Sequence, residues 1–316
     1  MAEATRFVEH SRPPGMRLGL RPSDPDKSYL EFERFWTGTV PSHPTSVNNM
    51  ANVSDWGLYG NDKFGTCGPA SVGNFIKYLT KDLTGTEVSP SVNDAYDLYR
   101  RSGNPTFNAT TGSGDNGVSM AVMLGALTSG GIGGMRSLAY AKVDVTNLNA
   151  IRAAIAIFGG LLLGINMQTA QQNQTNANPP LWNYSQSAVW GGHAVVAGKY
   201  TSATSGADIG VVSWAKPIGT TDSFWTHQVQ EAWAVILPAH LGTTQFISGI
   251  DTATLNADYL ALTGNPGPFT SGGGGDPGGG GDDPPPDPSD PAVATFLSGL
   301  RGIVTTVSNG LTNIGY

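Results

Sequence analysis

Cys67, the single cysteine of the chain, and His193, one of five histidines, are the side chains best suited to nucleophilic chemistry. Cys67 stands in FGTCGPASVGNFIKYL, where a Gly-Thr turn precedes it and apolar-periodic residues follow, so it is predicted to open a helix. A helix N-terminus carries partial positive charge, which predicts a lowered thiol pKa. A lone cysteine is also commonly a small buried hydrophobe, and this stretch alone leaves both interpretations open.

His193 lies in WGGHAVVAGKY, directly after Gly191 and Gly192 and at the head of an apolar strand. The two glycines let a substrate backbone approach closely, and an imidazole placed here can take a proton from a thiol. Trp190 precedes the glycines and either walls a substrate groove or packs in the core. These two glycines, Trp190 and Trp214 are the expected substrate-binding residues.

Helical patterns fill the first part of the globular region and strand patterns fill the second. Periodicity and end signals predict helices over 67–79, 89–103, 115–131, 147–160 and 252–264. LLLGINM, HAVVAGKY, IGVVSWA and AWAVIL are short, apolar and β-branched, as strands are. This order predicts an α+β fold in which a helical half carrying Cys67 packs on an antiparallel sheet half carrying His193.

Composition divides the chain into four segments. Residues 1–50 are proline-rich and weakly periodic, and are expected to form an extended N-terminal arm that packs by its aromatics on its own domain or on a partner. Residues 51–264 carry the globular pattern. Residues 265–291 are rich in glycine and then in proline, cannot form a core and are expected to be a linker.

Residues 292–316 form the fourth segment and carry a heptad seam of apolar residues on an otherwise polar, glycine-containing helix. The seam consists of Val293, Leu297, Leu300, Val304, Val307, Leu311 and Ile314. Such a helix is weak by itself, so we expect it to dock on another protein or to oligomerise with its own copies. Folding back onto the main domain is the alternative.

Composition also excludes several classes of function. The 316 residues carry a net charge of −7 with no Lys/Arg-rich run, so nucleic-acid binding is not expected. One cysteine excludes an internal disulfide and a multi-cysteine metal site, and we expect no metal or other cofactor. The first residues lack a signal-peptide pattern and no apolar run reaches membrane-spanning length, so a soluble chain made in the cytoplasm is expected.

The motif order resembles the papain-like cysteine peptidase superfamily. YGNDKFGTCGPASVGNFI, GGHAVVAGKY and VVSWA follow one another as that superfamily orders its nucleophile, its base and the segment that orients the base. The separation of Cys67 and His193 is close to the roughly 130 residues of papain-type enzymes. The resemblance implies a papain-like fold, Cys67 as nucleophile and His193 as base. Asn61 stands where the superfamily has an oxyanion-donating Gln; a simple turn amide is the alternative for this residue.

The residue that would orient the histidine is not matched. The superfamily follows its base with Asn-Ser-Trp-Gly, in which the Asn orients the histidine and the Trp shields the contact. Here Val212 stands at the Asn position and Trp214 at the Trp position, and a valine cannot hydrogen-bond an imidazole. Three other residues can take this role: Asp208 on the same strand, Ser213 if a bulge turns it inward, and Glu231 from the last strand.

A closer resemblance is to phage and prophage proteins that carry a Gly-Asn-Asp-x-x-Gly-x-Cys segment. They also carry a Trp-Gly stretch, a Gly-Gly-His-Ala strand and an acidic-Ala-aromatic-Ala-Val strand. The counterparts here are Trp56–Gly57, Gly60–Cys67, Gly191–Ala194 and Glu231–Val235. This resemblance implies synthesis in a bacterial cytoplasm and association with a virion.

Two functions therefore stay open. The first is a virion-associated hydrolase that cleaves peptide or amide bonds, in protein or in cell-wall peptide, through a thioester on Cys67. The second is a catalytically inactive virion protein, a capsid or tail accessory, that uses the papain-like fold as a scaffold and assembles through residues 292–316. The order of the motifs favours the first function. The missing Asn and the linker with its helical tail favour the second.

Overall fold

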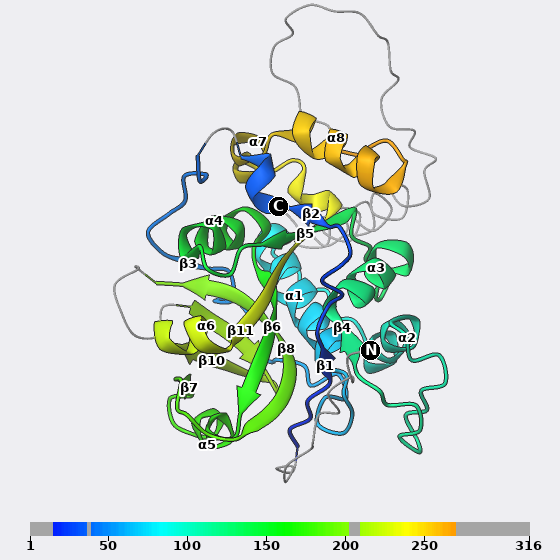
Figure 1. The fold of residues 1–316 in the computed structure, drawn as a ribbon, viewed down its shortest axis with the longest axis vertical. Helices are drawn as coiled ribbons and strands as arrows, with labels where there is room; N and C mark the ends of the chain where they lie inside the picture. Colours follow the sequence, from blue (N-terminus) through cyan, green and yellow to red (C-terminus); the bar gives the residue numbers. More distant parts are fainter. Residues whose placement is uncertain (1–14, 37–38, 202–208, 270–316) are drawn as a thin grey trace, which may run out of the picture.

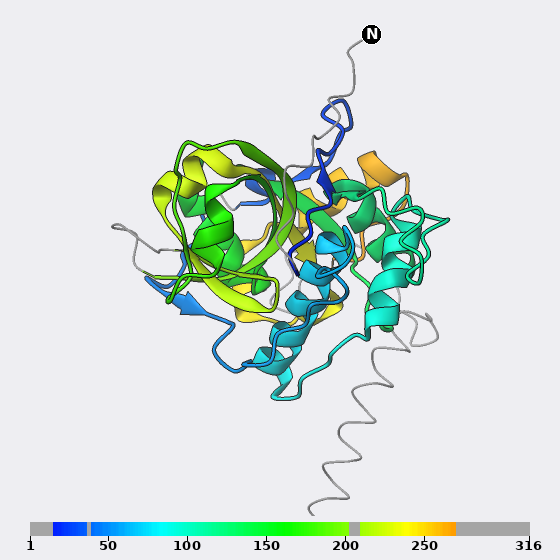
Figure 2. The ribbon, with the colours of Figure 1, turned by 90° about the horizontal axis from the view of Figure 1, so that it is seen from below.

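The computed structural model describes residues 15–36, 39–201 and 209–269, with a curled sheet beside a group of helices (Figures 1 and 2). The helices are α1 (Cys67–Thr84), α2 (Val92–Arg101), α3 (Met120–Gly130), α4 (Leu148–Phe158), α5 (Ala170–Thr175), α6 (Asp222–Gln228), α7 (Thr244–Gly249) and α8 (Thr252–Thr263), and the 3-10 turns are η1 (Phe32–Phe35) and η2 (Pro238–His240). The strands are β1 (Leu20–Arg21), β2 (Leu30–Glu31), β3 (Val47–Asn48), β4 (Val118–Ser119), β5 (Ala139–Val143), β6 (Leu161–Gln168), β7 (Leu181–Trp182), β8 (Val189–Tyr200), β9 (Ile209–Ser213), β10 (Lys216–Thr220) and β11 (Val229–Ile236).

The larger sheet within the described residues has the strand order β2-β5-β11-β6-β8-β9-β10-β7, and β3 also pairs with β8. Its central pairs are antiparallel, as the sequence predicts, whereas the outer pairs β2–β5 and β7–β10 are parallel. The long strand β8 lies between β6 and β9, so His193 belongs to the centre of the sheet. The short strands β1 and β4 pair in parallel beside it.

Successive residues of β8 belong to two different apolar clusters, one on each face of the sheet. Val195 and Ala197 pack in the cluster that includes Trp214. Ala194 and Val196 pack in the cluster that includes Cys67 and the buried residues of α1. The helical and sheet halves are therefore joined through one face of β8. The contact includes Cys67, the first residue of α1.

α1 begins at Cys67 and ends at Thr84, and the left-handed backbone of the next residue, Gly85 (φ 73°), stops the helix. Pro69 occupies an early position, where a missing N–H costs little. The predicted apolar positions of this helix are all buried: Ala70, Val72, Phe75, Ile76 and Leu79. This burial against β8 and the neighbouring helices fixes the helix axis and, with it, the place of the thiol.

Two predicted helices begin later than the sequence pattern indicates. α2 is capped by Ser91, which forms a capping box with Asp94, rather than by Ser89. α3 begins at Met120 instead of residue 115, because Gly117 is left-handed (φ 73°) and the next two residues form β4. The stretch from residue 115 to residue 119 therefore lies beside β1 as a turn and a strand.

The described part of the N-terminal arm packs on its own domain. Phe32 and Phe35 are almost fully buried in the main cluster, and Leu30 pairs with β5. The seam residues 293–314 and nearly all of the expected linker lie outside the described residues. No helix among the described residues is long and apolar enough to cross a membrane.

Candidate active site

Cys67 is enclosed at the start of α1, with 1% of its surface exposed. Burial raises the pKa of its thiol to about 12, although hydrogen bonds from the backbone of Ala194, Gly68 and Gly19 act in the opposite direction. The lowered pKa expected from the helix start is therefore wrong for this state of the protein, because desolvation of the thiolate outweighs the field of the helix. Since the backbone contact comes from Ala194, the thiol lies beside the residue that follows His193.

His193 is 1% exposed and has one hydrogen-bond partner. Its Nε2 lies 2.7 Å from the Oγ of Ser213, while its Nδ1 is buried without a partner. Burial lowers the pKa of the ring to about 3, so the imidazole is neutral. A neutral ring that donates its Nε2–H to Ser213 keeps the lone pair of Nδ1 free to accept a proton. In that tautomer Nδ1, which has no partner among the described residues, is the nitrogen that can accept a proton.

Ser213 is the candidate third member that the structure brings to His193. In the β8–β9 ladder Val212 is opposite Val196, and both belong to the cluster on the α1 side. Ser213, one residue further on, faces the other side of the strand and reaches the imidazole there. The sequence interpretation expected a bulge for this, but ordinary strand alternation is sufficient. The superfamily pattern would place the orienting residue at position 212, but Val212 faces the α1 side of the strand, away from the imidazole.

A tight turn places Trp214 over the imidazole. Ser213 pairs with Lys216, and the two residues between them, Trp214 and Ala215, have φ values of 45° and 58°, as a two-residue hairpin of the primed type requires. The indole stacks on the ring of His193 at 4.1 Å between centroids and 13° between planes. The stack shields the His193–Ser213 contact from water.

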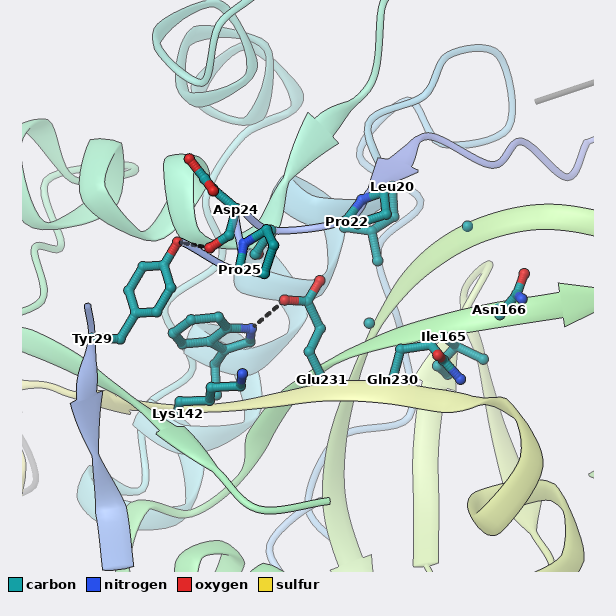
Figure 3. A pocket seen from close by; sticks show the side chains of 14 residues that line it. Leu20, Pro22, Asp24, Pro25, Tyr29, Lys142, Ile165, Asn166, Gln230 and Glu231 are labelled. Atoms are coloured by element: carbon teal, nitrogen blue, oxygen red, sulfur yellow. Dashed lines mark hydrogen bonds between the residues drawn. The ribbon is translucent and has the colours of Figure 1, made fainter. Parts of the chain in front are cut away.

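The remaining sequence candidates have different surroundings. Trp190 is 3% exposed and stacks on Trp214 at 5.6 Å, so its ring packs behind that of Trp214. Glu231 accepts a hydrogen bond from Trp233 Nε1 at 3.0 Å and lines a pocket (Figure 3). Asp208 lies outside the described residues.

A segment of the N-terminal arm, residues 17–21, fills the groove between the two halves (Figure 1, where β1 lies between β8 and β4). The N–H of Gly19 donates to the carbonyl of Gly192 at 3.2 Å, and the carbonyl of Gly19 accepts from the N–H of Val118 at 2.7 Å. Main-chain bonds of this kind hold an extended peptide whatever its side chains are. The segment is therefore held between the two halves by its own backbone.

Asn61 also binds this segment. Its Nδ2 donates to the carbonyl of Arg17 at 3.1 Å, and Trp214 Nε1 donates to the same oxygen at 3.2 Å. The carbonyl of Asn61 accepts from the N–H of Arg17 at 3.1 Å. Asn61 Nδ2 also donates to the carbonyl of Phe64 at 3.0 Å, which fixes the direction of the amide. The expected oxyanion donor thus holds a peptide carbonyl of the occupying segment.

Gly19 is the residue of the segment with the least room. A Cβ placed on it would lie 2.2 Å from the carbonyl oxygen of Gly65, two residues before Cys67. Gly192 is equally restricted, because a Cβ there would lie 2.3 Å from the carbonyl oxygen of Leu20. The segment and the walls of the groove meet backbone to backbone, so a side chain at either position would push them apart.

Asp115 and Tyr99 hold the turn before Cys67, and sequence interpretation missed both. The carboxylate of Asp115 accepts the N–H of Gly65 at 3.0 and 3.1 Å, and the Tyr99 hydroxyl donates to it at 2.5 Å. The same hydroxyl accepts from the N–H of Gly117 at 2.8 Å. These bonds tie the turn before Cys67 to the turn before β4, both on the helical side of the segment. The only sequence signal, Gly-Asp-Asn-Gly at 114–117, indicates a turn, whereas the sequence analysis placed it in a helix.

Comparison with known proteins supports the fold. No family model matches the chain, and no curated protein matches it by sequence. Among solved structures, xylellain, a cysteine protease from Xylella fastidiosa, is similar with a TM-score of 0.54 and 12% identity, over 73% of this chain and 99% of that one. Procathepsin B from Trypanosoma congolense aligns with a TM-score of 0.47 and 11% identity, over 70% of this chain and 86% of that one. The chain has a papain-like α+β fold.

Proposed function

We propose that this chain is a cysteine hydrolase that cleaves peptide or amide bonds, with Cys67 as nucleophile and His193 as base. The observation that carries the proposal is the state of the histidine: Ser213 orients its Nε2, while Nδ1 is unused, and the next residue along β8 contacts the thiol. An oriented imidazole with one unused nitrogen, one residue from a backbone group that contacts the single cysteine, is the arrangement that a nucleophile and its base require.

In the proposed reaction, Nδ1 of His193 accepts the thiol proton and the sulfur attacks the substrate carbonyl. Asn61 Nδ2 and the backbone N–H of Cys67 stabilise the oxyanion that forms. The proton then passes from His193 to the leaving amine, and a thioester on Cys67 remains. Water, deprotonated by His193, attacks this thioester and regenerates the thiol. Ser213 keeps the ring in one orientation throughout, and Trp214 excludes water from that contact.

Residues 17–21 must leave the groove before any substrate enters. They occupy the donors of Val118 and Asn61 and bury the thiol. The high thiol pKa belongs to this closed state, because desolvation is the largest cause of the shift and outweighs the backbone hydrogen bond of Gly19. Release of the segment would admit water to the thiol. The partial positive charge at the start of α1 and proton acceptance by His193 would then favour the thiolate.

We further propose that the protein is virion-associated, attached to other virion proteins or to its own copies by residues 292–316. The resemblance of the Gly60–Cys67 segment to phage and prophage proteins supports this, as does the heptad pattern behind a long linker. A purely structural role is the second candidate, and the buried thiol of the closed state favours it.

The test is hydrolysis by a chain that begins at residue 22, which lacks the occupying segment. We expect this truncated protein to cleave fluorogenic peptides and to form a mass-detectable adduct with a peptide vinyl sulfone at Cys67. Cys67→Ala should abolish both, and Asn61→Ala should lower turnover about 10²–10³-fold while the adduct still forms slowly. A folded truncated protein that shows neither hydrolysis nor adduct would establish the structural role instead.

A further inference from the structure

Asn61 ends a tight turn whose backbone conformation is unusual for its sequence. Tyr59 and Gly60 both have left-handed backbones (φ 49° and 80°), and the N–H of Asn61 donates to the carbonyl of Leu58 at 2.9 Å. This is a turn of the primed type, which glycine adopts freely and a residue as bulky as tyrosine rarely does. Such a conformation persists only where the surrounding structure imposes it, so contacts from outside the turn must hold Tyr59 in place.

Asn74 of α1 binds both main-chain groups of Gly57, the residue that precedes the turn. Its Oδ1 accepts the N–H of Gly57 at 2.9 Å, and its Nδ2 donates to the carbonyl of Gly57 at 2.9 Å. Nδ2 also donates to the carbonyl of Ala70 at 3.1 Å, and only 3% of the surface of Asn74 is exposed. A buried amide with three bonds to the main chain has one orientation, so Gly57 is fixed relative to α1.

The start and the second turn of the same helix hold Tyr59 itself. The hydroxyl of Thr66, the N-cap residue of α1, donates to the carbonyl of Tyr59 at 3.1 Å. The ring of Tyr59 packs against Gly73, where an added Cβ would lie 2.8 Å from two ring atoms. Gly73 and Asn74 are adjacent, so one short stretch of α1 holds both ends of the strained turn.

We propose that Gly73 and Asn74 position the amide of Asn61 relative to the thiol of Cys67, with Asn74 as the main positioning residue. Cys67 and Asn74 are seven residues apart, two turns of α1, so the helix that carries the thiol also sets the place of the amide. An asparagine has one methylene between its backbone and its amide, so its side chain cannot compensate for a displaced turn. The inference rests on the proposed role of Asn61 as a donor to a carbonyl, which in the closed state is that of Arg17.

The experiment measures how fast iodoacetamide alkylates Cys67 in the full-length protein. Labelling requires residues 17–21 to open, so Asn61→Ala, which removes one hydrogen bond to Arg17, should accelerate it about 2- to 12-fold. Asn74→Ala should accelerate it at least as much, because it displaces the whole turn. Since both act through the same amide, the double variant should label no faster than the faster single variant. Effects that multiply in the double variant would overturn the proposal.

Two further variants separate positioning from a general loss of stability. Gly73→Ala adds a methyl against the Tyr59 ring without removing a hydrogen bond, and alanine favours the helix, so it tests the same contact even if Asn74→Ala does not fold. It should accelerate labelling in the wild type and not in Asn61→Ala. Asn49→Ala is the matched control, because Asn49 also donates two bonds to main-chain carbonyls, those of Ile155 and Gly159. Equal acceleration by Asn49→Ala, or none by Gly73→Ala, would overturn the proposal.

Turnover distinguishes this inference from the proposed function. In full-length Gly19→Ala, whose added methyl meets the backbone of Gly65, Asn74→Ala should lower kcat for a fluorogenic peptide by up to about 10²–10³-fold with KM unchanged. It should cause no further loss in Asn61→Ala. A change in KM alone would overturn the positioning role. If Gly19→Ala hydrolyses no peptide while the labelling rates still couple, the hydrolase proposal fails and the positioning of Asn61 stands.

Discussion

At the scale of single residues, two buried histidines remain neutral in the folded protein for the same reason, desolvation. His193 is desolvated beneath Trp214, with its pKa lowered to about 3, and serves the proposed chemistry. His240 is desolvated in the core, with its pKa lowered to about 4, and its Nδ1 accepts the N–H of Leu237. Burial alone therefore does not mark a catalytic histidine. His193 differs in two ways: its Nε2 has Ser213 as a partner, and the backbone of the next residue, Ala194, contacts the thiol of Cys67.

The two histidines predict how stability depends on pH. Their folded pKa values lie below the ordinary 6.5, so the unfolded chain binds more protons between about pH 6.5 and 4. Their contribution is complete above pH 6.5 and is lost as the pH falls, by up to about 1.4 kcal/mol per pH unit for each ring. Urea unfolding from pH 7.5 to 4 measures this. His193→Gln should make the fall shallower, and an unchanged slope in that variant would contradict the assignment.

At the scale of elements, the position of Cys67 depends on how the start of α1 is held. The N–H of Gly65 is bound by Asp115, and Tyr99 connects that carboxylate to Gly117 next to β4. This hydrogen-bonded link sets the position of the turn before Cys67 relative to β4. A charged acceptor that satisfies a backbone donor is among the stronger hydrogen bonds in proteins.

Asp115→Ala should therefore destabilise the protein by about 1.5–3 kcal/mol in urea unfolding, because it leaves the Gly65 N–H and the Tyr99 hydroxyl without their acceptor. Asp115→Asn keeps one acceptor and should recover part of the loss. Asp55→Ala is the matched control, since that side chain is 98% exposed and lies 3.7 Å from Lys77, a pair worth at most about 1 kcal/mol. Equal losses for Asp115→Ala and Asp55→Ala would show that the link does not hold the turn.

α1 and β8 could be predicted from the sequence, whereas the role of Ser213 on β9 could be predicted only in part. Apolar periodicity predicts α1 and its start at Cys67, and glycines before an apolar strand predict His193 on β8, because both depend on local pattern. Ser213 was less certain, since its role depends on which face of β9 meets the imidazole and on the left-handed turn at Trp214. Local propensity encodes neither the strand face nor this turn. The choice among Asp208, Ser213 and Glu231 as the orienting residue therefore needed the sheet register.

At the scale of the whole molecule, the N-terminal arm lies against the candidate site. Residues 17–21 are held by main-chain bonds to Gly192 and Val118 and by Asn61 and Trp214. Backbone bonds place few demands on side-chain identity, so no motif in the arm predicts this position. The only requirement is steric, and Gly19 meets it because its missing Cβ leaves room for the carbonyl of Gly65.

Gly19→Ala should open the groove without removing any of the arm. The added methyl meets the Gly65 backbone, and overpacking of about 1–3 kcal/mol shifts the segment toward the open state roughly 5- to 150-fold. Alkylation of Cys67 by iodoacetamide at pH 7.5 should accelerate by this factor. Gly242→Ala is the control, since a Cβ there has no atom within 4 Å, and its labelling rate should equal that of the wild type.

The pH profile of Cys67 alkylation in Gly19→Ala, measured with and without His193→Gln, tests the central claim most directly. If the opened thiol is paired with His193, labelling persists well below pH 8.5 and His193→Gln moves the profile up to that of an ordinary thiol. A profile that already follows an ordinary thiol in Gly19→Ala, and that His193→Gln leaves unchanged, would contradict the pairing of nucleophile and base.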